Sequence, residues 1–114
     1  MKEREGFVSN SSSTLFVITN KTDHVVDLVL FVEENPRLVV QFNQIYDGNY
    51  RNADLVEEAK NKNITWEPNE RKTCEFGDHA GPYSDTSIGE VYDTILRHGG
   101  ESRSFKWKFL ELNR

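Results

Sequence analysis

The chain has 114 residues, which fits one domain that buries about two-thirds of the surface its unfolded chain exposes. Its formal net charge of −5 at pH 7 argues against a general nucleic-acid binder, because such proteins carry a basic surface. The single cysteine, Cys74, excludes an internal disulfide and is expected to be a small packing residue or a half-exposed bystander, not a nucleophile. No apolar run is long enough to span a bilayer and the first residues do not resemble a secretory signal, so we expect a cytoplasmic protein.

The charges are unevenly distributed along the chain. Eight acidic residues and two arginines lie between Asp23 and Glu58, whereas five basic and two acidic residues lie between Arg97 and Arg114. This asymmetry predicts one acidic side of the molecule and another side that is mildly basic.

Residues 1–13 are polar and rich in serine, which is typical of a flexible leader. The apolar run Thr14–Ile18 follows directly and is rich in residues that favour strands. Because it is apolar at both alternating positions, it predicts a strand covered on both faces, in the interior of a sheet.

Residues 24–34 are compatible with a helix or with a strand. A helix would be capped by Thr22 or Asp23 and would place its apolar residues on one stripe, whereas a strand would form a hairpin with Thr14–Ile18. We favour the helix. Its apolar stripe consists of Val25, Leu28, Val29 and Val32.

Two further helices are predicted from apolar residues at helical spacing. The first has Asn35 as its cap and Pro36 in its first turn, and it ends before Asp47-Gly48-Asn49. The second spans Ala53–Lys62. Their apolar residues are Leu38, Val39, Phe42, Ile45 and Tyr46 in the first helix, and Leu55, Val56 and Ala59 in the second.

Three more strands are predicted in the second half of the chain. Ile64–Glu67 and Arg71–Phe76 flank Pro68-Asn69-Glu70, a turn that predicts a hairpin. The last stretch, Ser102–Leu112, has the period-two pattern of a half-buried strand, and we expect it to form the floor on which the helices pack. Its inward residues are Phe105, Trp107 and Phe109, with Lys106 and Lys108 on the opposite face.

A final helix is predicted after a loop over residues 77–84. Asp85 or Thr86 caps this helix and Gly99 ends it. Its apolar residues are Ile88, Val91, Tyr92, Ile95 and Leu96. Together these elements predict a single α+β domain over residues 1–114: a mostly antiparallel sheet of about four strands, with three to four helices packed chiefly on one face.

The segment Gly6–Ile18 resembles the GFVSNSSSSSF-type N-terminus of many small uncharacterised proteins from bacterial and phage genomes. Further segments similar to this group are Phe31–Pro36, Phe76–Asp78, Gly89–Asp93, Gly99–Ser102 and Ser104–Trp107. Thr14-Leu15 departs from the longer serine run of the group. The resemblance implies a phage or mobile-element origin and favours the helix over residues 24–34, and it implies no catalytic residue.

The serine run and the basic C-terminal strip form one candidate site. Hydroxyls and successive backbone N–H groups bind oxyanions, and lysines beside aromatic side chains bind single-stranded nucleic acid. The run lacks the glycines and lysine of a P-loop, so we favour a disordered leader or an edge extension of the Thr14 strand. The helices need the aromatic face, so we favour a core role for the aromatic strand. The candidate anion or nucleic-acid contacts are Ser11, Ser12, Ser13, Arg103, Lys106 and Lys108.

No catalytic or metal-binding motif is recognisable in the sequence. Asp78-His79, Ser84-Asp85 and His98 flank one predicted helix, but their spacing matches neither a nucleophile elbow nor a paired metal-ligand set. His98 is placed to interact with the end of that helix. We therefore expect no enzyme activity, no metal and no cofactor.

The acidic side predicts a surface that meets a basic partner. Its candidate residues are Asp27, Glu33, Glu34, Glu57 and Glu58. We expect a non-enzymatic interaction protein, a phage or mobile-element accessory factor that binds and modulates a host protein, with inhibition of a host defence as one version. The alternative is a small nucleotide- or nucleic-acid-binding module that uses the serine leader and the basic strand. No membrane partner is expected, and the oligomeric state stays open.

Overall fold

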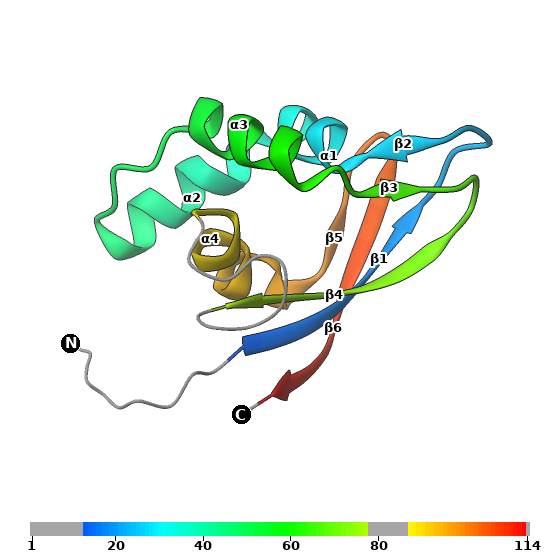
Figure 1. The fold of residues 1–114 in the computed structure, drawn as a ribbon. Coiled ribbons are helices and arrows are strands. Elements are labelled where there is room, and N and C mark those ends of the chain that lie inside the picture. Colours follow the sequence, from blue (N-terminus) through cyan, green and yellow to red (C-terminus); the bar gives the residue numbers. More distant parts are fainter. Residues whose placement is uncertain (1–12, 78–86, 114) are drawn as a thin grey trace.

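The computed structural model describes residues 13–77 and 87–113. Within these residues the chain forms a four-stranded antiparallel sheet, a small two-stranded sheet and four α-helices. The predicted α+β fold class is therefore confirmed. The described helices gather on one side of the four-stranded sheet and leave its other side uncovered (Figure 1).

The strands of the larger sheet are β1 (Ser13–Asn20), β4 (Arg71–Gly77), β5 (Gly100–Glu101) and β6 (Phe105–Asn113). They lie in the order β4-β1-β6-β5. β1 is central, as its apolar sequence predicts, and pairs antiparallel with β4 on one side and with β6 on the other. β5 is a short edge strand that forms a hairpin with β6.

The two faces of β1 have different surroundings. Phe16 and Ile18 are fully buried on the side of the helices, whereas Val17 and Thr19 are half-buried on the opposite face. The prediction that both faces are covered is wrong for the described residues, because their helices cover one face only. No described helix therefore covers this half-buried face.

The helices are α1 (Leu28–Glu34), α2 (Pro36–Tyr46), α3 (Asn52–Lys62) and α4 (Ser87–Ile95), which continues as a 3-10 turn, η2 (Leu96–His98). Phe31 of α1 connects this layer to the sheet, with ring centroids 5.1 Å from Phe105 and 5.3 Å from Trp107. Tyr92 of α4 packs 5.5 Å from both Phe31 and Phe76. These edge-to-face contacts form one core between the helices and the sheet.

The helix predicted over residues 24–34 begins later than expected. Val26–Asp27 forms a short strand, β2, and α1 follows it. Asp27 caps the helix by accepting a backbone N–H of its first turn at 2.9 Å, a role that the sequence assigned to Thr22 or Asp23. Asn20 accounts for the difference, because its side-chain oxygen accepts the N–H and the hydroxyl of Thr22 and holds that segment in a turn.

The apolar stripe of α1 differs from the predicted one. Val25 lies before the helix and is 53% exposed, and Val29 is only half-buried. The buried residues are Leu28, Phe31 and Val32. Phe31, which was not assigned to the stripe, makes the main contacts with the sheet.

α2 follows the prediction except at its two ends. Ile45 and Tyr46 were expected to point inward, but they are 58% and 54% exposed near the last turn. Asn35 occupies the N-cap position, but its side-chain amide donates to the carbonyl of Phe31 at 2.9 Å. Asn35 therefore closes α1 instead of capping α2. The buried residues of α2 are Leu38, Val39 and Phe42.

The last two helices bury the residues that their patterns predict. Leu55 and Ala59 of α3 are buried, and Val56 is half-buried. Every residue of the apolar stripe predicted for the α4 segment is buried. Gly99 ends this segment as predicted and adopts a φ of 73°, which favours glycine. Asp85 and Thr86, the predicted caps, lie outside the described residues.

The hairpin predicted between residues 64–67 and 71–76 is wrong. Thr65–Trp66 forms β3, which pairs with β2, while β4 pairs with β1. The chain turns at Asn69, which adopts a φ of 62°, and the two strands join different sheets. Trp66 explains the separation, because its ring is fully buried and its indole N–H donates to the carbonyl of Ile18 at 3.0 Å.

The aromatic strand β6 shows the predicted alternation over its first half. Phe105 and Trp107 are buried against the helices, while Lys106 and Lys108 are exposed. A β-bulge then shifts the register against β1, and Phe109 is 42% exposed there. The predicted inward role of Phe109 is thus met only in part.

Candidate binding surface

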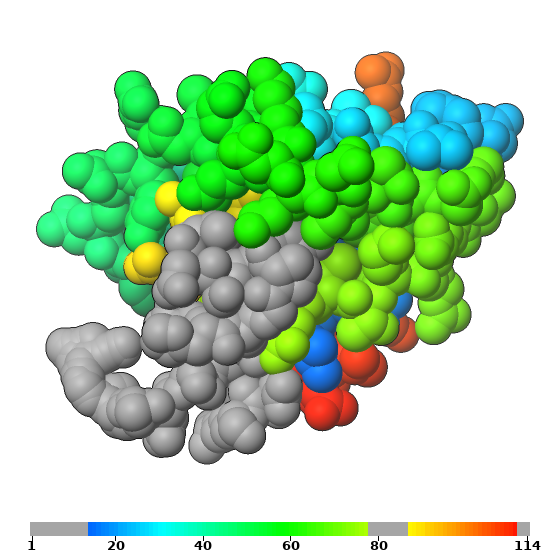
Figure 2. Space-filling view, in the orientation of Figure 1, coloured from blue at the N-terminus to red at the C-terminus, as the bar shows by residue number. Residues whose placement is uncertain are grey.

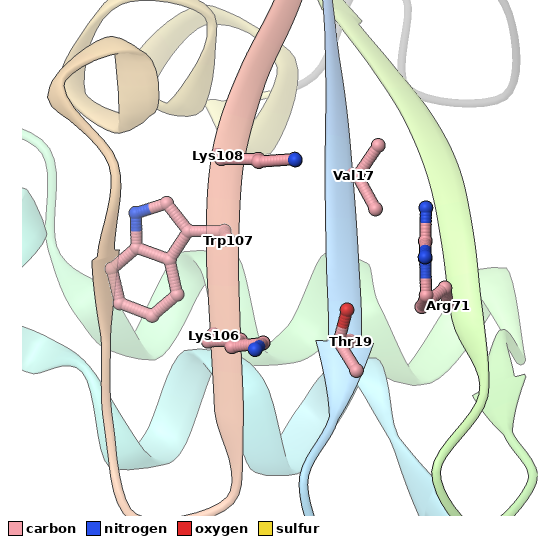
Figure 3. A pocket seen from close by; sticks show the side chains of 6 residues that line it. All are labelled: Val17, Thr19, Arg71, Lys106, Trp107 and Lys108. Carbon is pink, nitrogen blue, oxygen red and sulfur yellow. The ribbon is translucent and has the colours of Figure 1, made fainter.

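A pocket of about 290 Å³ lies on the face of the larger sheet that the described helices do not cover, which we call the helix-free face (Figure 3). Its floor is formed by Val17 and Thr19 of β1, which have short side chains. Its walls are the long side chains of Arg71 from β4 and of Lys106 and Lys108 from β6. We call these five residues the cationic groove.

The strand register sets the position of each side chain in the cationic groove. Thr19 pairs with Arg71 on one side and with Lys106 on the other, so these residues form one row across the sheet. Val17 pairs with Lys108 in the next row on the same face. Adjacent strands lie about 4.8 Å apart, which places the backbones of Arg71 and Lys106 about 10 Å apart.

The three cations of the groove form no direct ion pair with the described part of the fold, although the charges of Lys106 and Glu101 interact. Among residues 13–77 and 87–113, Arg71, Lys106 and Lys108 form no ion pair. Glu101 pairs with Lys106 in the strand register, but its carboxylate binds Lys21 at 2.7 Å. The hydrogen bond and charge of Lys21, with a smaller contribution from Lys106, lower the pKa of Glu101.

Trp107 borders the groove without presenting its ring to it. The ring lies on the far side of β6, beside β5, and is 5% exposed (Figure 3). The predicted core role of Trp107 is therefore confirmed. A stacking platform for bases, which needs an exposed ring, is not available from this residue.

The charged residues on the helix-free face change from basic to acidic toward the N-terminal end of β1. Leu15, the next residue of β1 on this face, pairs with Glu75 of β4 and with Glu111 of β6. The face thus runs from a cationic row at Thr19 to a row with two carboxylates at Leu15.

Three of the five acidic residues predicted as a partner surface make contacts inside the fold. Asp27 caps α1, Glu34 binds the loop between β5 and β6, and Glu58 binds the start of α4. The contacts of Glu34 and Glu58 join residues 29 to 70 positions apart, so no local pattern reveals them.

Glu34 joins the end of α1 to the β5–β6 loop. Its Oε1 accepts the hydroxyl of Ser102 at 2.5 Å and the N–H of Ser104 at 2.7 Å. Burial raises the pKa of Glu34, but the combined effect of these hydrogen bonds and the nearby charge of Arg103 is larger. The pKa of Glu34 therefore lies below its ordinary value of 4.5. The charged carboxylate is therefore the form that anchors the loop.

Glu58 of α3 caps α4 from outside that helix. Its two carboxylate oxygens accept the N–H groups of Ser87 at 3.1 Å and of Ile88 at 3.0 Å. The first N–H groups of a helix have no partner within it and carry a partial positive charge, so a carboxylate here stabilises the helix.

The remaining two acidic candidates, Glu33 and Glu57, are exposed. Glu57 pairs with Lys60 at 3.4 Å, and Asp54 on the same helix pairs with Arg51 at 3.1 Å. These ion pairs partly neutralise the acidity of the helical layer. Figure 2 shows α2 and α3 of this layer along the upper part of the surface, with β6 in red visible only at the lower edge.

The predicted anion contacts do not form one site. Lys106 and Lys108 lie in the cationic groove, whereas Arg103 lines a separate surface depression with Leu30, Glu33 and Glu34. Ser11 and Ser12 lie outside the described residues, and of Ser13 only the backbone position at the start of β1 is described.

Arg71 belongs to the groove and was not selected from the sequence. It lies 35 positions before Lys106 in the sequence. The two residues line the same groove because β4 and β6 are the two neighbours of β1 in the sheet. Arg71 could have been selected only from the correct strand order, and the prediction paired its strand with residues 64–67 and not with β1.

The residues considered for catalysis or metal binding gain no support. Asp78-His79 and Ser84-Asp85 lie outside the described residues, and His98 is exposed at the end of η2. Within the described ranges, no group of three or more His, Cys, Asp or Glu side chains is arranged to hold a metal ion. Nor is any helix in those ranges both long and apolar enough to cross a membrane.

No family model, curated protein or solved structure matches this chain. The resemblance of Gly6–Ile18 to bacterial and phage proteins therefore stays a prediction.

Proposed function

We propose that this chain is a non-enzymatic interaction protein that binds an acidic region of a partner protein through the cationic groove. One observation carries the proposal: three cations without an ion pair among the described residues surround a half-buried floor, on a face that the described helices leave open. The whole chain has a net charge of −5, so overall composition does not account for this cluster.

An anionic partner is the physical complement of this surface. Clustered like charges repel one another, and on a free surface only water and salt weaken that repulsion. A bound acidic segment replaces the repulsion with attraction and covers the apolar side chain of Val17.

The contacts of the helical layer favour the groove over the acidic side as the working surface. Asp27, Glu34 and Glu58 are bound to other parts of the fold, and Glu57 has a local lysine partner. Less of the predicted acidic surface is left for a basic partner.

The partner in this proposal is a protein of a bacterial host, met in its cytoplasm. The resemblance of the N-terminal segment to phage proteins supports that choice. A phage accessory factor, with inhibition of a host defence as one version, belongs to the same proposal.

Nucleic-acid binding is the second candidate, favoured by the lysines of β6. Sheet-surface readers of single strands place aromatic side chains on the same face as their basic residues. Here Phe105 and Trp107 face the helices, and Glu75 and Glu111 flank the other end of the open face. A protein partner is therefore preferred.

Capture from nuclease-treated host lysate tests the proposal. Tagged wild-type chain and the Lys106→Glu/Lys108→Glu variant are compared, and captured proteins are identified by mass spectrometry. We expect a protein that is enriched on the wild type and lost on the variant. The Lys60→Glu/Lys62→Glu variant makes the same charge change on α3 and should retain it. Equal capture by wild type and groove variant contradicts the proposal.

A further inference from the structure

We propose that the cationic groove binds one extended peptide segment with acidic side chains at alternate positions. This inference rests on the proposed function and specifies the chemistry of the partner. The segment lies along β1, over Thr19 and Val17, between the side chains of β4 and β6.

The spacing of the cations sets the spacing of the acids. Lys106 and Lys108 are two residues apart on the same face of β6, and so lie about 7 Å apart along the strand. An extended peptide presents every second side chain to one side with the same repeat. Acidic residues at alternate positions therefore meet one lysine of β6 each, whereas of two adjacent acids one meets a lysine and the other points toward β4, where Arg71 supplies the cation.

The width of the groove selects an extended chain over a helix. The backbones of Arg71 and Lys106 lie about 10 Å apart, and their long side chains narrow the space between them. A helix with its side chains measures about 10–12 Å across, so it would have to displace the side chains of Arg71 and Lys106, whereas a single extended chain lies between them.

The acidic row limits how far the negative charge of the ligand extends. Beyond the two cationic rows, Leu15 is flanked in register by Glu75 and Glu111. Glu111 therefore favours a basic or uncharged residue at the next alternate position of the bound segment. A nucleic-acid strand carries charge at every phosphate, so it meets repulsion at this row.

Short synthetic peptides with blocked ends test the inference by fluorescence anisotropy at low salt. The probe has two glutamates at alternate positions, threonine between them, and lysine at the next alternate position. One control peptide has the same composition with the glutamates adjacent, and another replaces both glutamates with glutamine. An oligothymidylate of similar length reports on nucleic acid.

With the Arg71→Gln variant, in which the groove keeps only the cations of β6, we expect the alternate-glutamate peptide to bind about two- to fivefold more tightly than the adjacent-glutamate peptide, as one exposed ion pair implies. The glutamine peptide and the oligothymidylate should bind more weakly than both. Added to Arg71→Gln, the Lys106→Glu/Lys108→Glu change should abolish the preference, and Lys60→Glu/Lys62→Glu should keep it.

Two results overturn the inference. Equal affinity of the Arg71→Gln variant for the alternate and adjacent peptides removes the spacing argument, and tighter binding of the oligothymidylate replaces the peptide with nucleic acid. In either case the proposed function stands if host-protein capture still depends on Lys106 and Lys108, and it falls separately if that capture does not.

Discussion

Trp107 fills the space between the hairpin of β5 and β6 and the helical layer. Its ring packs 5.3 Å from that of Phe31, and a Cβ added to Gly100 would lie 2.8 Å from its Cζ2. The ring thus occupies the space that a side chain on β5 would need. Gly100 is the residue type that permits this close approach.

The Gly100→Ala variant should therefore lose about 1–3 kcal/mol of unfolding free energy, because the added methyl group overpacks the site. Denaturant melts measure the loss. An unchanged stability for Gly100→Ala would contradict the packing described for Trp107.

Truncation of Trp107 separates its core role from a surface role. Trp107→Ala should cost about 3–5 kcal/mol through lost burial and the cavity it leaves. Lys106→Ala and Lys108→Ala, on the exposed face, should each cost well under about 1 kcal/mol. Denaturant melts of the three variants give the ordering, and a fully stable Trp107→Ala protein would refute the buried position.

Glu34 makes stability depend on pH in a defined direction. Its pKa is lowered in the folded chain, so it contributes stability above its ordinary pKa of 4.5 and loses that contribution as pH falls through the lower, folded-state value. Glu34→Gln should cost about 1 kcal/mol at pH 7, less than a fully buried charged hydrogen bond because solvent screens this group. Melts at a series of pH values should show the difference shrinking below 4.5, and a constant difference would be inconsistent with this role.

At the scale of elements, the sequence predicted where helices form but not how some helices are capped or which strands pair. The helices of residues 36–46 and 52–62 follow from local spacing, because their buried residues lie three or four positions apart. The partner of β3 and the cap of α4 depend on residues far away in the chain. Local patterns carry no information on such contacts, which is why residues 64–67 were predicted to pair with Arg71–Phe76 and not with Val26–Asp27.

The cap of α4 by Glu58 predicts a difference between two adjacent glutamates of α3. Glu58→Ala should lower the unfolding free energy by about 0.5–2 kcal/mol, because it leaves the first N–H groups of α4 without their acceptor. Glu57→Ala removes an exposed ion pair with Lys60 and should cost less than about 0.5 kcal/mol. Melts of both variants under the same conditions make the comparison. Equal losses would show that Glu58 does not act as a cap.

At the scale of the whole molecule, the sequence predicted the layer order but not the composition of the open face. Alternation in β6 placed Lys106 and Lys108 opposite the core, and this follows from residue spacing alone. Arg71 entered the cationic groove only through the order of strands β4, β1 and β6. The prediction of an acidic partner surface is less favoured for a similar reason. Glu34 and Glu58 bind residues that are distant in the sequence, and the sequence pattern does not reveal these contacts.

Electrostatic binding through the groove predicts a strong dependence on salt. The screening length falls from about 10 Å at 0.1 M salt to about 3 Å at 1 M, so partner affinity should fall steadily over this range. Titration of the captured partner at several salt concentrations measures the slope. The Lys106→Glu/Lys108→Glu variant should show a flatter slope, and an unchanged slope would place the interaction elsewhere.

The central claim is that the helix-free face of the sheet, and not the acidic helical layer, contacts the partner. An NMR titration of isotope-labelled chain with the captured partner tests this most directly, because each backbone amide reports its own surroundings. The account predicts that shift changes concentrate at Val17, Thr19, Arg71, Lys106 and Lys108. Changes confined to α1 and α3 around Glu33 and Glu57, with the groove residues unaffected, would contradict it.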